Sequence, residues 1–434
     1  MSALAATRAR PSGRRPARTH LRTVFARPDG TVLDHPELEA AADMGVSARA
    51  NVADFIPLPK GSLLLALPGR SVVGYDTASQ REVSCYDGAE VCAVAAALPL
   101  GFTRLALPAY VERPAAPVLP LYGYTAVAWG KDGFFAAAVR TDELESWSAK
   151  LHHPDQVSEA IALRSLEFPG NSILQQLSRC AHEYACFTAQ NTFLRQGEAA
   201  IPVSVACNAR CIGCISEQDP EAQVKSAQER IRRRPSLDEI CDIAIAHLQT
   251  VPGGMVSFGQ GCEGEPLLAS PLIEQAIRRI RAATSAGTIH CNTNASDASA
   301  LGRLLDAGLQ SVRVSLNSAR PHIYEAYYRP RGYGFADVKE SLALAARKGA
   351  AISLNLLTHP GVTDDPAEIA AFAELLTAVP VAMVQTRTLN VDPAVYFAAV
   401  SRPRERTLGM RQWLAWLHHD FPGVGVGNFT RGFG

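Results

Sequence analysis

The pattern of apolar and polar positions changes near residue 200 of this 434-residue chain. Beyond that point, short β-branched apolar runs alternate with segments whose apolar residues recur at helical spacing, which predicts repeated strand–helix units. Six strands joined by helical crossovers predict an α/β fold with a parallel sheet, open or curled into a partial barrel. The predicted strands are IPVSVA, MVSFG, TIHC, SVRVSL, ISLNLL and VAMVQT, and the predicted helices cover 236–250, 271–285, 297–307, 336–348 and 365–378.

Helix-end signals support these boundaries. Ser236 with Glu239, and Asp365 with Glu368, have the spacing of a capping box, in which each side chain binds the backbone N–H of the other residue. Ser270 directly precedes a proline, which predicts a cap followed by proline at the first helical position.

The segment before residue 200 has a different pattern. Short apolar runs separated by Gly, Pro and Asp turn signals predict a smaller mixed, β-rich domain, with helices near 155–164 and 173–195. The first 27 residues hold seven arginines and no acid, which indicates a basic disordered tail. The expected organisation is this tail (1–27), the β-rich N-terminal domain (28–199), the strand–helix core (200–395) and a C-terminal helix and tail (396–434).

Composition narrows the classes of function. Lys plus Arg equals Asp plus Glu at 42 each, so no overall charge favours nucleic acid or an anionic membrane. No apolar run approaches the roughly 18 residues of a membrane span, so we expect a cytoplasmic protein without a membrane partner. Ten cysteines are too few for a disulfide scaffold, and three within eight residues indicate metal binding or catalysis in a reducing compartment.

The three clustered cysteines, Cys207, Cys211 and Cys214, have the spacing C-x3-C-x2-C directly after the first core strand. Three thiolates in one short loop suit a soft metal centre, but no close fourth Cys or His follows, as structural zinc sites usually require. A [4Fe-4S] cluster normally uses four cysteines, so three would leave one iron open to another ligand. A zinc loop or a chance spacing is the alternative.

Polar side chains follow every predicted strand at its carboxyl end, which is where parallel α/β sheets bind their ligands. We therefore expect all six sets to converge on one site. The sets are the three cysteines after the first strand, Glu263 and Glu265 after the second, Asn292 and Asn294 after the third, Ser315 and Asn317 after the fourth, His359 and Asp364 after the fifth, and Gln385, Arg387, Asn390 and Asp392 after the sixth.

The cysteine loop at the start of a strand–helix repeat resembles the radical S-adenosylmethionine (radical SAM) superfamily. The resemblance covers about residues 200–395 and implies a partial (β/α)6 TIM-like barrel. It also implies an enzyme in which a [4Fe-4S] cluster on the three cysteines binds S-adenosylmethionine (SAM) through its open iron. Reductive cleavage of SAM would then give a 5′-deoxyadenosyl radical that abstracts hydrogen from a substrate, which the sequence does not identify.

Further segments resemble the SAM-binding motifs of the family. Each of them has a structural alternative, such as capping of the following turn by Glu265. The residues are Gly264, Glu265 and Pro266, similar to the Gly-Gly-Glu region that receives the SAM amino group; Ser315 and Asn317, similar to the ribose-binding position; and Asn292 and Asn294, similar to the polar turn after the third strand.

One position departs from the family pattern. Members commonly place an aromatic residue directly before the third cysteine, where it packs the adenine, but this chain has Gly213 there. The source of the adenine contacts is therefore left open. The resemblance also implies an electron donor such as flavodoxin or ferredoxin. The alternative function is a non-catalytic metal or iron–sulfur scaffold protein, which would have no need of polar groups beside an open iron.

Two further features lie outside these motifs. Cys180 and Cys186 precede the core in a helical pattern, and because two thiols alone hold no conventional cluster, we expect buried thiols there. A charged segment, 216–234, separates the third cysteine from the next helix and indicates a solvated loop, with a lid as the alternative.

Overall fold

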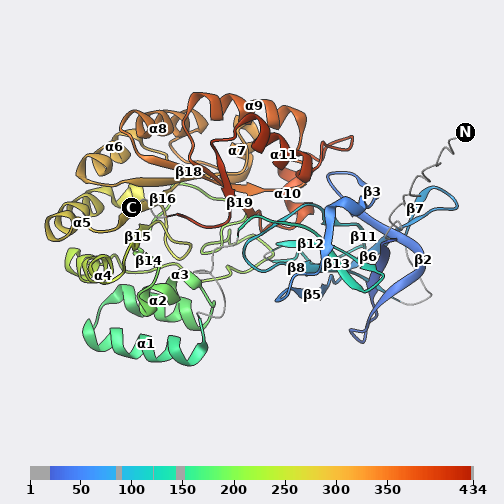
Figure 1. The fold of residues 1–434 in the computed structure, drawn as a ribbon, viewed down its shortest axis with the longest axis horizontal. Coiled ribbons are helices and arrows are strands. Elements are labelled where there is room, and N and C mark those ends of the chain that lie inside the picture. The colour runs from blue at the N-terminus through green and yellow to red at the C-terminus, as the bar shows by residue number, and fades with distance from the viewer. Residues whose placement is uncertain (1–19, 85–89, 121, 143–151, 432–434) are drawn as a thin grey trace, which may run out of the picture.

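A computed structural model describes residues 20–84, 90–120, 122–142 and 152–431 of the chain. It contains an antiparallel sheet in the N-terminal part and a parallel sheet in the C-terminal part (Figure 1). The predicted disordered tail lies outside the described residues as far as residue 19. The segment Arg22–Ala26, which the sequence pattern placed in that tail, instead forms a strand of the antiparallel sheet.

Thirteen antiparallel strands make up the N-terminal sheet within the described residues: β1 (Arg22–Ala26), β2 (Val32–Asp43), β3 (Ser47–Arg49), β4 (Phe55–Pro57), β5 (Leu63–Ala66), β6 (Arg70–Asp76), β7 (Arg81–Ser84), β8 (Cys92–Ala97), β9 (Phe102–Arg104), β10 (Leu107–Pro108), β11 (Tyr110–Glu112), β12 (Tyr124–Gly130) and β13 (Gly133–Arg140). A one-turn 3-10 helix, η1 (Val52–Asp54), precedes β4. Successive residues of β8 pack into two different apolar clusters, Ala93 and Ala95 on one face and Val94 and Ala96 on the other. The predicted β-rich region is confirmed.

Three helices connect the two sheets: α1 (Pro154–Glu167), α2 (Ser172–His182) and α3 (Phe187–Leu194). The single helix predicted over 173–195 is therefore two helices. The break occurs where Ala185 takes a left-handed conformation, with φ of 48°. Asn171 marks the start of α2, because its side chain accepts the N–H groups of Ile173 and Leu174.

Seven parallel strands follow in sequence order across the second sheet: β14 (Glu198–Ala200), β15 (Met255–Phe258), β16 (Thr288–Thr293), β17 (Ser311–Leu316), β18 (Ala351–Thr358), β19 (Met383–Thr388) and β20 (Gly425–Gly427). The sheet curls into a half barrel, which confirms the predicted fold class. The six-strand prediction is wrong by one, because the Gly-Val-Gly strand β20 has no apolar run to reveal it. The first strand also lies earlier than predicted, and the chain continues buried through Ile201, whose N–H binds Ser257 O at 2.8 Å.

Helices follow the parallel strands and cover the outer side of the half barrel (Figure 1). The five predicted core helices are confirmed to within about two residues at each end. The observed helices are α4 (Leu237–Thr250), η4 (Pro266–Ala269), α5 (Ser270–Ala283), α6 (Ala298–Ala307), α7 (Pro321–Tyr328), α8 (Phe335–Arg347), α9 (Pro366–Ala378), α10 (Pro393–Val400) and α11 (Met410–Asp420).

The predicted caps are confirmed in part. Ser236 and Glu239 form the full capping box at α4. Asp365 caps α9, but Glu368 turns away from it to bind the loop after β17. The prediction for Ser270 is wrong, because Ser270 is the first residue of α5 and its side chain caps nothing there.

The two faces of the parallel strands differ in polarity. In β17, Val312, Val314 and Leu316 are fully buried under the helices, whereas Arg313 and Ser315 point to the inside of the half barrel and line a cavity. Successive side chains of a strand alternate between its faces, so the sequence SVRVSL supplies an apolar outer face and a polar inner face. The half barrel therefore has a polar interior at its carboxyl end.

The N-terminal sheet covers this end of the half barrel. A buried ion pair joins Arg70 of β6 to Asp392, with 2.6 Å between Nη2 and Oδ2, and the same oxygen accepts Leu119 N–H at 2.8 Å. Thr103 of β9 binds Thr386 of β19 through their hydroxyls at 2.6 Å. Among the described residues, no helix is both long and apolar enough to cross a membrane.

Replacing Asp392 with Ala is expected to lower the free energy of unfolding by about 3 kcal/mol, because the buried guanidinium of Arg70 would keep only its longer contact with the exposed Glu112, at 3.3 Å. Chemical denaturation followed by circular dichroism measures the loss. The control is Glu274→Ala, which removes the exposed ion pair with Arg278 and should cost less than about 1 kcal/mol. Equal losses in the two variants would contradict the structural importance of the buried pair.

Candidate functional site

A cavity of about 620 Å³ lies between the carboxyl ends of the parallel strands and the N-terminal domain. A second cavity of about 870 Å³ adjoins it at the cysteine loop, and Cys207 and Cys211 line both. The structure thus brings together most of the predicted site residues, which come from four different strand ends. Those on the first cavity are Cys207, Cys211, Gly264, Glu265, Pro266, Asn292, Asn294 and Ser315, and Cys214 lines the second.

The cysteine loop is held by helix α7 rather than by secondary structure of its own. Arg210 N–H donates to Tyr328 O and Ile212 N–H donates to Tyr327 O, both at 3.0 Å. A side chain at Gly213 would collide with this support, because an added Cβ would lie 2.8 Å from the Tyr327 hydroxyl. The glycine in place of the expected aromatic residue therefore makes room for the aromatic ring of Tyr327.

The segment after β15 lies directly against the start of the cysteine loop. Gly264 N–H donates to Ser204 O at 2.7 Å and Glu265 N–H donates to Ala206 O at 2.8 Å. A Cβ on Gly264 would stand 1.9 Å from Ala206 O, so only glycine permits this approach. Glu265 of the Gly-Glu-Pro motif is thereby hydrogen-bonded to Ala206, the residue directly before the first cysteine, Cys207.

Glu263 joins the same two segments through a buried carboxylate. One oxygen accepts Val203 N–H and Ser204 N–H at 2.7 and 2.8 Å, and the other accepts Gly259 N–H and Gln260 N–H at 2.6 and 2.7 Å. Burial raises the pKa of Glu263 to about 7, while the four N–H donors favour its charged form. This carboxylate thus joins two backbone segments, residues 203–204 before the cysteine loop and residues 259–260 after β15.

Glu265 binds the carboxyl end of the next strand. Its carboxylate accepts Asn294 N–H at 2.8 Å, the Thr293 hydroxyl, and Leu267 N–H at 3.1 Å, the last of which caps η4. Burial raises the pKa of Glu265 to about 7, and these donors oppose that rise. The expected structural alternative, a turn-capping role, is thus present, and the residue lines the cavity as well.

The two asparagines of the third strand end bind protein groups at the cavity wall. Asn292 binds His290 at 2.9 Å and Phe258 O at 3.2 Å. Asn294 donates to the Asn208 side chain at 2.8 Å, which links the third strand end to the cysteine loop. Both residues are structurally engaged while lining the cavity.

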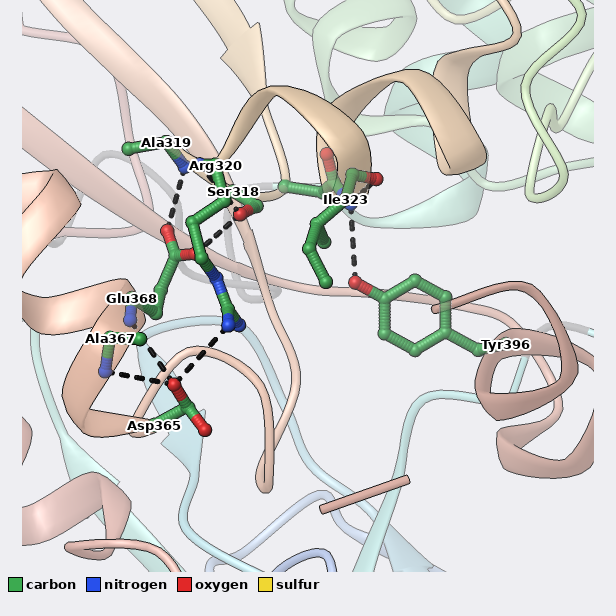
Figure 2. A network of polar contacts seen from close by, with 9 residues as sticks. Ser318, Ala319, Arg320, Ile323, Asp365, Ala367, Glu368 and Tyr396 are labelled. Atoms are coloured by element: carbon green, nitrogen blue, oxygen red, sulfur yellow. Dashed lines mark hydrogen bonds and ion pairs between the residues drawn. The ribbon is translucent and has the colours of Figure 1, made fainter. Parts of the chain in front are cut away.

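Asn317 does not line either cavity. Its amide donates to Tyr396 Oη at 3.1 Å and to Ile323 O at 3.3 Å. Figure 2 shows Tyr396 and Ile323 within the polar network that follows β17. In the same network Glu368 accepts Ala319 N–H at 2.7 Å and Arg320 Nε at 3.0 Å. The network fixes the start of α7, whose last residues hold the cysteine loop.

The fifth set of polar residues is also absent from both cavities. His359 is buried against Tyr396 and Phe397, and Asp364 accepts Thr407 and Gly409 from the C-terminal segment. The expectation that all six sets converge is therefore wrong for the fifth strand. Asn355 of β18 lines the cavity instead, at an inward position of the predicted strand ISLNLL that strand alternation could have indicated.

Burial governs the acidity of the clustered thiols. It raises the pKa of Cys207 to about 11 and the pKa of Cys211 well above its ordinary value. Arg230, from the charged segment after the loop, donates to Cys214 Sγ at 3.7 Å. Within the described part of the chain, no three His, Cys, Asp or Glu side chains are arranged to hold one metal ion. The loop therefore brings the three thiols into one region without directing them at a single metal position.

The other cysteines near the site are structural. Cys180 of α2 is buried, as expected, whereas Cys186 is only half-buried, so the expectation of buried thiols is wrong for Cys186. Interaction with the Cys180 thiol and burial raise the pKa of Cys262 well above its ordinary value. Cys262 thus points to α2 and not into either cavity. The segment 216–234 forms no helix or strand, and residues 217–227 contribute to the wall of the larger cavity.

Comparisons with known proteins give a family match over part of the chain. The family model of the Radical SAM superfamily matches residues 201–373, and a search of curated proteins found no match. The chain is similar to the solved structure of the radical SAM methyltransferase TsrM from Kitasatospora setae, with tryptophan and a SAM analogue bound (16% identity, TM-score 0.34). That similarity covers 46% of this chain and 36% of TsrM, about a third of its length.

Two other solved structures are similar over a larger part of this chain. One is HydG, a maturase of the [FeFe]-hydrogenase (14% identity, 64% of this chain and 63% of that chain, TM-score 0.38). The other is a mutant spore photoproduct lyase with bound AdoMet and dinucleoside spore photoproduct (14% identity, 62% of this chain and 96% of that chain, TM-score 0.38).

Glu263→Gln is expected to lower the free energy of unfolding by at least about 2 kcal/mol, because the amide nitrogen would face two backbone N–H donors and leave them unsatisfied. Urea denaturation measures the loss, and faster hydrogen exchange at Ser204 and Gly259 would locate it. The matched control is Glu340→Gln on the exposed side of α8, expected within about 0.5 kcal/mol of the parent protein. A loss no larger than the control would show that the carboxylate does not organise the site.

Proposed function

We propose that this chain, whose residues 201–373 match the family model of the Radical SAM superfamily, binds a [4Fe-4S] cluster on Cys207, Cys211 and Cys214 and cleaves SAM reductively. One observation carries the proposal. Three thiols and the residues that resemble the SAM-binding motifs, Asn317 excepted, line two adjoining cavities, although they come from four strand ends. An enzyme of this superfamily requires a substrate and a source of electrons.

The donor set fits such a cluster. Three partly exposed thiols lie in one loop, and no Cys or His follows closely to complete a four-ligand zinc site. Arg230 donates to Cys214 Sγ at 3.7 Å and so places a positive charge beside this thiol. The cluster, when bound, would supply the electron that breaks the S–C5′ bond of SAM and yields methionine and a 5′-deoxyadenosyl radical.

The neighbouring residues would orient SAM. Glu265 uses both carboxylate oxygens on three protein donors, and two oxygens have about four lone-pair sites, so one acceptor position is available for an ammonium group. Ser315, with its side chain on the cavity, suits a ribose hydroxyl, and Asn292 and Asn294 shape the wall between the two. Asn317 would act indirectly, through the position of α7.

Aromatic contacts to adenine would come from α7. Tyr327 and Tyr328 both line the cavity beside the cysteine loop, and Tyr327 occupies the space that Gly213 leaves free. Their rings stand at 89° to one another with centroids 4.9 Å apart, so they present faces in two directions. The two tyrosines would thus take the place of the aromatic residue that family members commonly carry at position 213.

The larger cavity suits an acidic electron donor such as flavodoxin or ferredoxin. Its wall includes Lys225, Arg329 and Arg331 together with Glu221, and the other acids on the wall are paired with arginines: Glu217 with Arg230, Asp219 with Arg210 and Asp392 with Arg70. Electrostatic attraction of this kind increases association rates and weakens with salt. The alternative function, a non-catalytic scaffold, leaves the polar inner face of the half barrel unexplained.

Simultaneous replacement of Cys207, Cys211 and Cys214 by Ala is expected to reduce iron in the anaerobically reconstituted protein from about four atoms per chain to near zero. Iron analysis and the broad visible absorption of the cluster measure the change. The double variant Cys180→Ala, Cys186→Ala is the control and should keep its iron. A triple variant with a full cluster would assign the ligands to other cysteines.

Glu265→Gln is expected to raise the dissociation constant of SAM about tenfold while leaving the iron content unchanged, because a charge-assisted hydrogen bond becomes a neutral one. Calorimetric titration of the reconstituted variant with SAM measures the affinity, and iron analysis runs alongside it. Unchanged SAM affinity would restrict Glu265 to its contacts with Thr293, Asn294 and Leu267. Lost iron would instead show that the carboxylate supports the cysteine loop.

A further inference from the structure

We infer that the substrate of this enzyme carries an anionic oxygen group, a carboxylate or a phosphate, and that Arg313 and Arg387 bind this group inside the half barrel. The inference rests on the proposed function, because it concerns the substrate of the same cavity. Both arginines line the cavity that also contains Cys207 and Cys211. A substrate held by them would therefore share one enclosed space with the cysteine loop.

Arg313 comes from the middle of β17 and its guanidinium is only partly satisfied. Its Nη1 donates to Gln385 Oε1 at 2.8 Å and to Thr430 Oγ1 at 2.9 Å, and both acceptors are neutral. Its Nε is buried without a hydrogen-bond partner. Neutral side chains thus hold the guanidinium in place and leave both its charge and one donor unmatched.

Arg387 comes from the carboxyl end of β19, two strands away from Arg313 across the inner face. Strand β18 between them contributes Asn355, whose Oδ1 is buried without a partner. Burial, and after it the positive charge of Arg313, lower the pKa of Arg387 to about 10. Two cations therefore line one polar cavity.

No carboxylate neutralises this pair within the part of the chain that the structure describes. Neither arginine forms an ion pair there, although Asp142 and Glu198 act on them through space. Asp142 accepts the N–H of Asn428 through one carboxylate oxygen, its Oδ1 is buried without a hydrogen-bond partner, and neither oxygen lies within ion-pair distance of the two arginines. Buried charges in proteins are normally paired, and this exception lies on the wall of a cavity large enough for a small molecule.

An oxyanion ligand would resolve the imbalance. The guanidinium is a planar fork that binds carboxylate or phosphate through two parallel hydrogen bonds, and the free Nε of Arg313 is one arm of such a fork. The amide of Asn355 offers a neutral donor between the two cations. Carboxylate and phosphate share this chemistry, so separate probes must distinguish them.

The test titrates full-length reconstituted protein with inorganic phosphate and, separately, with propionate at constant ionic strength, with isothermal calorimetry as the measurement. We expect one binding site for at least one of the two anions. Arg387→Met should weaken that binding about tenfold or more, and Arg387→Lys, which keeps the charge but loses the fork, should weaken it less. The preferred anion assigns the substrate group as phosphate or carboxylate.

Two controls separate the site from general effects. Arg303→Met removes an exposed arginine of α6 and should leave anion binding unchanged. The unfolding midpoint of Arg387→Met in anion-free buffer should not fall below that of the parent protein, because an unpaired buried charge is removed, and the stabilisation that the anion gives the parent protein should be lost. A midpoint well below the parent would make Arg387 a structural residue and overturn the inference.

Other outcomes also overturn it. Absence of binding by either anion would do so, as would equal weakening in Arg303→Met and Arg387→Met. Competition between SAM and the anion for the same site would mean that the arginines hold the carboxylate of SAM. Formation of 5′-deoxyadenosine by the parent protein is measured in parallel, so that failure of anion binding alone leaves the proposed SAM cleavage intact, and failure of SAM cleavage alone leaves the anion site intact.

Discussion

The site depends on one buried carboxylate that binds four backbone N–H groups. Glu263 joins the segment before the cysteines to the turn after β15. The next two residues continue this contact, because Gly264 N–H donates to Ser204 O and Glu265 N–H donates to Ala206 O. A carboxylate can accept four N–H donors because each of its two oxygens can accept two hydrogen bonds. The cysteine loop and the Gly-Glu-Pro motif are consequently one structural unit, although 50 residues separate them.

A second chain of contacts approaches the cysteine loop from the other side. Glu368 of α9 binds the turn after β17 and so sets the start of α7 (Figure 2). The last residues of α7 then accept the N–H groups of Arg210 and Ile212. The loop has no regular structure, yet both of its flanks are fixed by buried hydrogen bonds. Such support limits the backbone entropy that a flexible loop would lose on binding a ligand.

The polarity of the inner face distinguishes this half barrel from a purely structural one. Outward residues of β17 are apolar and fully buried, whereas the inward positions of β17, β18 and β19 include Arg313, Asn355 and Arg387. The N-terminal sheet covers this face through the Arg70–Asp392 ion pair and the contact between Thr103 and Thr386. The inward polar residues Arg313, Asn355 and Arg387 are thereby half-buried, and partial removal from water strengthens charge interactions with a ligand.

Local patterns in the sequence determined the elements and the chemistry. Apolar periodicity and the Ser236–Glu239 capping box predicted the strand–helix repeats, since these signals act within a few residues, and the spacing of Cys207, Cys211 and Cys214 predicted a metal-binding loop. The alternation of polar and apolar residues in SVRVSL also indicates that Arg313 points inward. No local signal indicates that its charge lacks an acidic partner. The short strand β20 left no apolar signal and was missed.

Only the tertiary structure decided which polar residues meet. Asn317 and His359 follow strands just as Ser315 does, yet buried tyrosine and phenylalanine rings surround them, away from the cavity. Likewise, Gly213 lies against Val391 and Tyr327, both more than a hundred positions along the chain. Such pairings depend on side-chain direction and on packing between distant segments. A sequence pattern places a residue on a strand end, but the neighbours that compete for its hydrogen bonds exist only in the folded chain.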